Sequence, residues 1–173
     1  KETNIGNFIA DAYRSSVNAD VGFVNGGSIR ADLTYEPGPL TKRAVLSLLP
    51  FNNPIVKVEV TGKTLKAILE HGVARSAPGE DGEPGRFPQI SGVRFEYDVK
   101  RPAGSRVVSV MVGGKPLDET KAYTVATSDF LVSRSGDGYT MFKDGKVLGS
   151  AATAPKDSDV FEAAIRSAPS ATI

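Results

Sequence analysis

The sequence predicts one α+β domain over residues 1–173, with a mixed, mostly antiparallel sheet packed with several helices. Apolar residues recur at helical spacing in several separate stretches, and alternating apolar residues mark short strands between them. The chain of 173 residues, 40% of them hydrophobic, is long enough for one ordinary core. Because helices are interspersed with mostly antiparallel strands, the pattern is typical of the α+β class.

The first half of the chain is expected to hold three helices and two strands. Thr3 or Asn4 can cap a helix over about 4–17, and a short apolar strand follows at 21–24. Thr41 introduces a second, short helix that Pro50 ends. Residues 55–60 alternate apolar and charged side chains as a strand with one wet face, and a third helix begins near Thr61-Gly62.

The second half begins with a surface loop and continues mainly as strands. Residues 76–85 contain two prolines, three glycines and three acids, which predicts a mobile loop. The alternating stretches 93–97 and 108–112 flank a Pro102-Ala103-Gly104 turn, so an antiparallel hairpin is expected. Another strand is predicted near 123–126, and a helix started by Asp159 and Glu162 closes the chain.

Composition excludes several functional classes. Lys and Arg total 21 against 20 Asp and Glu, without a dense basic stripe, so no nucleic-acid partner is expected. No apolar stretch approaches the roughly 18 residues that span a bilayer. The chain has no cysteine and one histidine, His71, interpreted as a surface residue, so no metal centre is expected within it. It starts at Lys1 rather than Met and is therefore expected to be a processed product or an excised fragment.

One loop carries the equipment of a small-ligand site. Asn25-Gly26-Gly27-Ser28-Ile29-Arg30 follows an apolar strand and combines an amide, two glycines, a hydroxyl and a guanidinium. Gly27 and its neighbour let the backbone come close to a bound group, and Arg30 offers donors for phosphate or carboxylate. Asn-Gly is also a common tight turn, so a plain turn is the alternative. A second segment, Thr61-Gly62-Lys63-Thr64, ends like a phosphate-binding P-loop. It lacks the first glycine that such a loop requires, so it is interpreted as a strand-to-helix turn.

Two aromatic residues extend this candidate site. Phe51 and Phe130 stand beside polar loop residues rather than inside alternating strands, and Asp137 is flanked by glycines. Two phenyl faces can clamp a flat base, and a carboxylate can accept hydrogen bonds from ribose hydroxyls. With Asn25 to read a base edge and Arg30 to meet phosphate, the set matches a nucleotide piece by piece. Each residue could instead serve the core or a turn, and spacing alone does not show that the loops converge.

The chain also resembles the C-terminal, substrate-recognition domain of the 5′-nucleotidase family along nearly its whole length. Four blocks in order carry the resemblance: Glu2-Thr3-Asn4-Ile5-Gly6-Asn7 with Ala10-Asp11-Ala12; Asn25 to Arg30; Leu49-Pro50-Phe51-Asn52-Asn53 with Thr61-Gly62 and Leu69-Glu70; and Gln89-Ile90-Ser91-Gly92 with Asp129-Phe130-Leu131 and Gly136-Asp137-Gly138-Tyr139.

The resemblance implies a role for each candidate residue. Phe51 and Phe130 resemble the aromatic pair that sandwiches the base. Asn25 resembles the amide that contacts the base, and Asn53 falls where some members use an asparagine nearby. Asp137 looks like the ribose-hydroxyl ligand, and Arg30 like one of the arginines on the phosphate side.

The family also implies what lies outside the chain. Its parent enzymes are exported metallophosphoesterases whose N-terminal domain holds two divalent metals, so an extracellular or periplasmic location is expected. The family's metal motifs are absent here, so the chain is expected to bind nucleotide or nucleoside without hydrolysing it. A further family arginine would precede Lys1. Ser135 stands where the family's Gly-Gly-Asp-Gly block has its first glycine, which costs backbone freedom.

The leading hypothesis is therefore the nucleotide-binding domain of a two-metal hydrolase that dephosphorylates nucleotides. The alternatives are the same domain of a 2′,3′-cyclic-nucleotide phosphodiesterase, a nucleotide-sugar hydrolase or a thiosulfohydrolase. A stand-alone binding module without a catalytic partner is the alternative from a different class.

Overall fold

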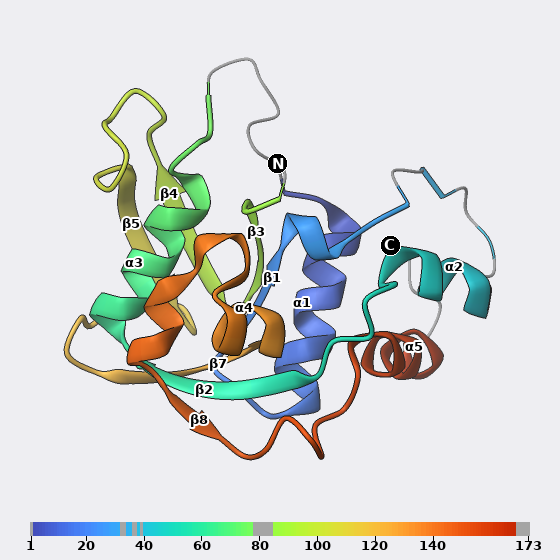
Figure 1. Ribbon diagram of the computed structural model, residues 1–173. Coiled ribbons are helices and arrows are strands. Elements are labelled where there is room, and N and C mark those ends of the chain that lie inside the picture. Colours follow the sequence, from blue (N-terminus) through green and yellow to red (C-terminus); the bar gives the residue numbers. More distant parts are fainter. Residues whose placement is uncertain (1, 32–33, 36–37, 39, 78–84, 169–173) are drawn as a thin grey trace.

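The computed structural model describes residues 2–31, 34–35, 38, 40–77 and 85–168 (Figure 1). It confirms the α+β class, with two separate sheets and five α-helices among these residues. In chain order the elements are α1 Asn4–Ser16, β1 Val21–Asn25, η1 Gly26–Ser28, α2 Lys42–Leu48, β2 Ile55–Thr61, α3 Gly62–Val73, β3 Pro88–Ser91, β4 Val93–Tyr97, β5 Val107–Val112, β6 Lys115–Pro116, β7 Ala122–Ser128, α4 Asp129–Arg134, η2 Gly136–Gly138, η3 Thr140–Asp144, β8 Lys146–Leu148 and α5 Asp157–Ser167, where η marks a 3-10 helix.

The larger sheet is mixed. Its five strands lie in the order β3-β1-β7-β2-β8. The β1 and β7 strands run parallel, with Val21 opposite Val125. The pairs β1–β3, β2–β7 and β2–β8 are antiparallel, and β2–β7 is the longest, from Ile55 opposite Ser128 to Thr61 opposite Ala122. The predicted mixed, mostly antiparallel sheet is confirmed.

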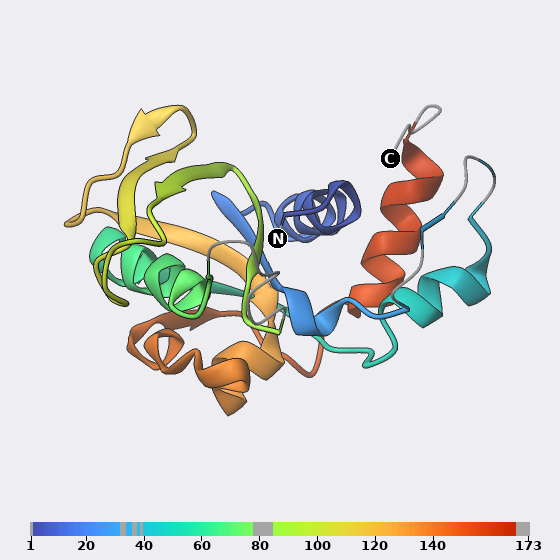
Figure 2. The same cartoon turned by 90° about the horizontal axis from the view of Figure 1, so that it is seen from above.

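Each face of this sheet covers its own apolar core. Along β7, Val125 belongs to one core and the next residue, Ala126, to the other, because successive side chains of a strand point to opposite faces. The first core packs the sheet against α3, η3 and the β4–β5 hairpin, and the second packs it against α1, α2 and α5. Figure 2 shows this layering from above, with α3 and α1 on opposite sides of the strands.

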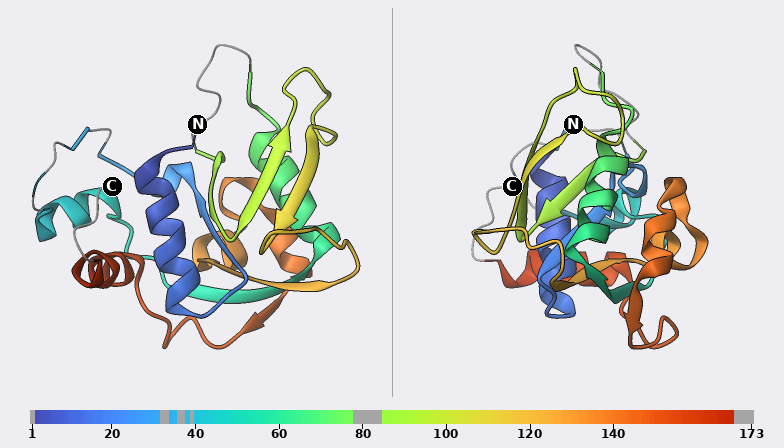
Figure 3. Two further views of the ribbon diagram at one scale, coloured as in Figure 1. Left: turned by 180° about the vertical axis from the view of Figure 1, so that it is seen from behind. Right: turned by 90° about the vertical axis from the view of Figure 1, so that its left-hand side faces the viewer.

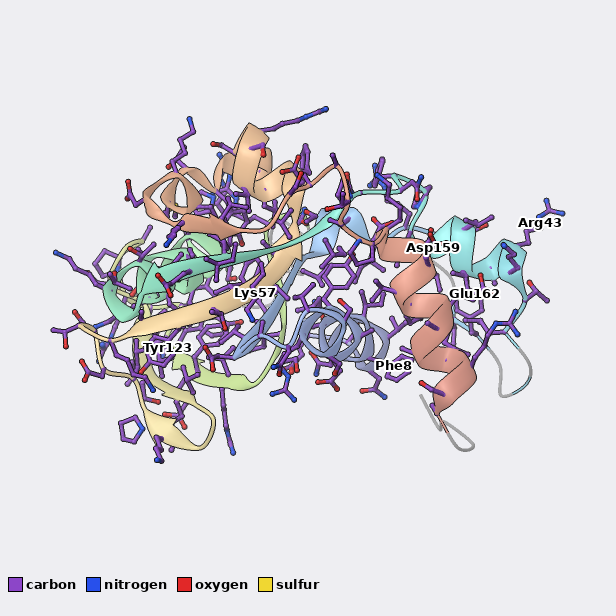
Figure 4. All side chains as sticks on the ribbon, turned by 90° about the horizontal axis from the view of Figure 1, so that it is seen from below. Phe8, Arg43, Lys57, Tyr123, Asp159 and Glu162 are labelled. Carbon is purple, nitrogen blue, oxygen red and sulfur yellow. The ribbon has the colours of Figure 1, made fainter. Side chains whose placement is uncertain are left out.

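Two of the helices that cover the second core contact each other directly. Phe8 of α1 meets Phe161 of α5 edge to face, with ring centroids 5.8 Å apart. Figure 4 labels Phe8 at this contact, and Figure 3 shows α1 between α5 and the β4–β5 hairpin.

Thr3 begins α1 by accepting a hydrogen bond from the Gly6 N–H, so of the two predicted caps Thr3 is the one used.

The predicted helices and the hairpin are confirmed, and several short elements are new. Strands β4 and β5 pair as expected, with an irregularity between Glu96 and Tyr97. The Thr61 hydroxyl accepts from the Thr64 N–H, so this segment is the strand-to-helix turn that the sequence predicts. The sequence did not indicate β3, β6, β8 or α4, all of which are short. Of the predicted loop at 76–85, residues 78–84 lie outside the described residues.

The loop that carries Phe51 is fixed to the start of α5. The Asn53 N–H donates to Asp157 Oδ2 over 3.0 Å, and the Asp157 N–H donates to the Asn53 carbonyl over 2.9 Å. Asp157 is 1% exposed. Burial raises the pKa of its carboxyl, and the hydrogen bonds from Asn53 only partly offset that effect.

This buried carboxyl predicts a pH-dependent stability. A folded-state pKa above the unfolded value means that the folded chain binds more protons, so Asp157 makes stability fall as pH rises from its ordinary pKa of about 3.9. Asp157→Asn keeps an oxygen acceptor without a titrating group. In urea unfolding between about pH 4 and 7, we expect the wild type to lose stability relative to this variant as pH rises. A constant difference between the two proteins would contradict the assignment.

The turn after α4 contains two non-glycine residues in the left-handed region. Ser135 has φ 52° and Asp137 has φ 50°, and Gly138 follows at φ 82°. Asparagine and aspartate tolerate this region through local hydrogen bonds, whereas serine has less compensation. The cost in backbone freedom that we expected at Ser135 thus has a structural basis, because its positive φ is one that glycine adopts more readily than serine.

We predict that Ser135→Gly stabilises the protein by about 1 kcal/mol, because glycine adopts positive φ at no steric cost. The buried Ser135 hydroxyl also has no partner among the described residues. Ser135→Ala is the control, since it removes the hydroxyl and keeps the strain. Chemical denaturation of the three proteins decides: equal stabilisation by alanine and glycine would assign the effect to the hydroxyl.

Candidate functional site

Sheet topology brings the ends of three strands to one edge. Because β1 and β7 are parallel, their last residues, Asn25 and Ser128, lie at the same edge. Strand β2 is antiparallel to β7, so it begins there, with Ile55 opposite Ser128. The connections at this edge carry the predicted site residues. The Asp129 N–H also donates to the Pro54 carbonyl over 2.8 Å, which ties two of these connections together.

Asn25 is the centre of a polar network at this edge. It is 1% exposed, and its Nδ2 donates to Asp137 Oδ2 over 2.5 Å. The same amide nitrogen is 3.4 Å from the Gly85 carbonyl oxygen, and Oδ1 accepts from the Ser28 hydroxyl over 2.5 Å. The amide thus orients the carboxylate of Asp137, which lies 112 residues away in sequence. Contact of Asn25 with a base stays a prediction.

Gly27 allows the backbone to approach this network closely. Its N–H donates to the Gly85 carbonyl over 2.8 Å. A Cβ atom at Gly27 would lie 3.2 Å from Asp137 Oδ2 and 3.2 Å from Gly85 Cα. A larger residue at Gly27 would therefore fit only if the Asp137 carboxylate and the Gly85 backbone moved by a few tenths of an ångström.

The backbone of Asp137 is held from a different element. His71, in the last turn of α3, has its Nε2 2.9 Å from the Asp137 carbonyl oxygen. A carbonyl oxygen only accepts, so this nitrogen carries the hydrogen. Asp137 is therefore fixed at its carbonyl by α3 and at its carboxylate by β1. The hydrogen bond from Asn25 occupies one lone pair of Oδ2, and a carboxylate can accept further hydrogen bonds, so Asp137 can also bind a ligand.

Tyr139 supports this turn from beneath. Its ring is fully buried, and its hydroxyl donates to the Arg86 carbonyl over 2.5 Å. Burial, and then the negative charge of Asp137, raise the pKa of the phenol, so it stays a neutral donor. The ring of His71 packs edge to face on Tyr139, with centroids 4.7 Å apart.

Phe51 and Arg30 form a pair at the surface. Phe51 is 51% exposed, although an aromatic side chain gains from burial. The Arg30 guanidinium carbon lies 5.5 Å from the centroid of the Phe51 ring, a cation–π geometry. The backbone N–H of Arg30 donates to the Leu48 carbonyl over 2.8 Å, which ties the segment around Arg30 to the end of α2.

Phe130 lies in the first turn of α4, at the same edge. It is partly buried against the first core. A Cβ atom at Gly136 would lie 2.0 Å from Cε1 of its ring, so the ring covers the backbone of the turn that presents Asp137. Asn53, the remaining predicted residue, uses its backbone to bind Asp157.

The structure thus joins the predicted residues in two groups: Asn25, Gly27 and Asp137 around one carboxylate, and Arg30 with Phe51 at the surface. Phe130 borders the first group. Sequence reasoning missed His71, Gly85 and Tyr139 as parts of the site, and it placed the Ser28 hydroxyl in the candidate loop without a specific role. His71 follows the Leu69-Glu70 block directly, which is the one sequence signal that could have drawn attention to it.

Among the described residues, no group of three or more His, Asp or Glu side chains is arranged to hold a metal ion. In that same part of the chain, no helix combines the length and apolar character needed to cross a membrane.

Comparison with known proteins agrees with this fold. A sequence profile for the family described as "5'-nucleotidase, C-terminal domain" matches residues 1–144. Among curated relatives, the trifunctional nucleotide phosphoesterase protein YfkN of Bacillus subtilis is 35% identical over 161 residues, covering 86% of this chain and 10% of that protein. A 5'-nucleotidase of Diplobatis ommata is 34% identical over 166 residues, covering 85% of this chain and 28% of that protein.

Solved structures agree as well. The 5'-nucleotidase precursor of Thermus thermophilus superposes with a TM-score of 0.82 at 35% identity, covering 95% of this chain and 32% of that one. The NAD nucleotidase of Haemophilus influenzae superposes with a TM-score of 0.75 at 28% identity, covering 91% of this chain and 29% of that one. The chain therefore spans at most about a third of the length of these relatives, and it belongs to the 5'-nucleotidase C-terminal domain family.

Proposed function

We propose that this chain is the nucleotide-binding domain of a 5′-nucleotidase-type hydrolase that converts a nucleotide and water into a nucleoside and phosphate. One observation carries the proposal. In a member of this family, the edge where β1 and β7 end and β2 begins gathers a held carboxylate, an exposed aromatic ring and a guanidinium. These are the groups that a ribose, a base and a phosphate require.

Each group has a separate task in this proposal. The base stacks between Phe51 and Phe130, and the half-exposed Phe51 ring offers a face at little desolvation cost. The Asp137 carboxylate accepts hydrogen bonds from the ribose hydroxyls with the lone pairs that Asn25 leaves free. Arg30 faces the phosphate side, and Asn53 lies near the base.

In this proposal, the metal ions that hydrolysis needs are bound outside this chain. Two divalent metals in an N-terminal metallophosphoesterase domain of the same parent protein would activate the attacking water. The chain would bind the nucleotide, orient it towards that domain and be inactive alone. Its span of 32% of the Thermus protein and 28% of the Diplobatis protein supports a longer parent.

The substrate can extend beyond a simple nucleoside monophosphate. The relative from Bacillus subtilis is named a trifunctional nucleotide phosphoesterase, and the Haemophilus neighbour is named an NAD nucleotidase. Both names refer to nucleotides, which agrees with a site that holds base and ribose. We further propose an extracellular or periplasmic location, since relatives include a snake venom 5'-nucleotidase of Crotalus adamanteus, 33% identical over 162 residues.

We predict that Phe51→Ala in the intact parent enzyme raises KM for nucleotides about tenfold or more, because one stacking contact contributes about 1–3 kcal/mol. The side chain is 51% exposed, so the melting temperature should change little and the effect on binding can be read separately. Phe51→Tyr retains the ring and is expected to keep KM within about twofold, as the matched control. Steady-state kinetics with adenosine and guanosine monophosphates provides the measurement. An unchanged KM in the alanine variant would exclude the clamp.

A further inference from the structure

We propose that His71 is a positioning residue that holds Asp137 in the conformation needed to bind ribose hydroxyls. This inference rests on the proposed function and adds a residue and a mechanism to it. In this role, His71 touches neither base nor ribose. It acts through the turn at residues 135–139, which we call the aspartate turn.

The aspartate turn has an unfavourable backbone. Ser135 and Asp137 are both left-handed, with φ 52° and φ 50°. Non-glycine residues are disfavoured in this region, so the turn needs external contacts to keep its shape. Two hydrogen bonds within the turn, from Gly138 N–H to the Ser135 carbonyl and from Tyr139 N–H to the Gly136 carbonyl, define its bends.

His71 contacts three successive residues of this turn. Its Nε2 lies 2.9 Å from the Asp137 carbonyl oxygen. A Cβ atom at Gly138 would lie 3.1 Å from its Cε1, and its ring packs edge to face on Tyr139 at 4.7 Å. One side chain on a regular helix thus fixes the carbonyl of Asp137 and packs against the two residues that follow it.

The contact with His71 complements the one made by Asn25. Asn25 Nδ2 fixes the Asp137 carboxylate over 2.5 Å from strand β1, and His71 fixes the carbonyl of the same residue from α3. Two anchors on different elements define both the position and the direction of the carboxylate. If the carbonyl anchor is lost, the turn can relax from its strained backbone, and the carboxylate no longer lies where the ribose hydroxyls need it.

The test is the preference of the intact parent enzyme for ribose, measured as the ratio of kcat/KM for AMP to that for 2′,3′-dideoxy-AMP. His71→Phe keeps an aromatic ring on Tyr139 and removes the donor, and we expect it to lower this ratio about tenfold. His71→Gln retains a donor at the end of the side chain and should keep the ratio within about threefold. Lys66→Gln, an exposed change on the same helix that breaks the 2.8 Å ion pair with Glu119, is the matched control and should leave the ratio unchanged.

Asp137→Asn separates this inference from the proposed function. If Asp137→Asn lowers the ratio and His71→Phe does not, the positioning role is wrong and the ribose assignment stands. If the wild type shows no preference, or Asp137→Asn leaves it intact, the ribose assignment fails and the inference fails with it. Equal losses of kcat/KM for both substrates in His71→Phe, with a lower melting temperature, would mean a merely structural histidine and overturn the proposal. Should His71→Phe not fold, His71→Leu replaces it with the same criteria.

Discussion

The parallel pairing of β1 with β7, inside a sheet whose other pairs are antiparallel, determines where the candidate site lies. It brings the carboxyl ends of two strands to one edge, and the antiparallel β2 begins at that same edge. Connections that start at residues 26, 49 and 129 therefore meet, although they are far apart in sequence. Both apolar cores, one on each face of the sheet, keep this edge in register.

A second constraint acts on the side chains at that edge. Asp137 is a carboxylate on a strained turn, and its position depends on donors from two other elements: Asn25 on β1 and His71 on α3. Arg86 contributes its carbonyl to Tyr139 beneath the turn. Such a network stabilises a single geometry, because a buried polar group that is left without its hydrogen-bond partner costs free energy. The side chains of Phe51 and Phe130 make no hydrogen bond in this network. Phe51 is exposed to solvent and contacts Arg30 instead.

The sequence was sufficient to predict the elements with clear periodicity. The helices α1 and α3 and the β4–β5 hairpin have strong apolar patterns, and the predicted bounds differ little from the observed ones. Strand β3 escaped prediction because it starts with a proline and buries consecutive residues instead of alternating. The six-residue α4 was missed because it is short and ends in polar residues. His71 looked like a surface residue because helix position alone does not reveal that a turn 66 residues later in sequence packs on it. Asn25 and Asp137 could both be singled out from the sequence as candidates, but their 2.5 Å contact needed the fold.

A crystal structure of the intact parent protein with a bound nucleoside, such as adenosine, tests the central claim most directly. We expect the base between the rings of Phe51 and Phe130, with the ribose hydroxyls within hydrogen-bond distance of the Asp137 carboxylate and the Asn25–Asp137 contact retained. A nucleoside bound at another part of this chain, or one whose ribose faces away from Asp137, would contradict it.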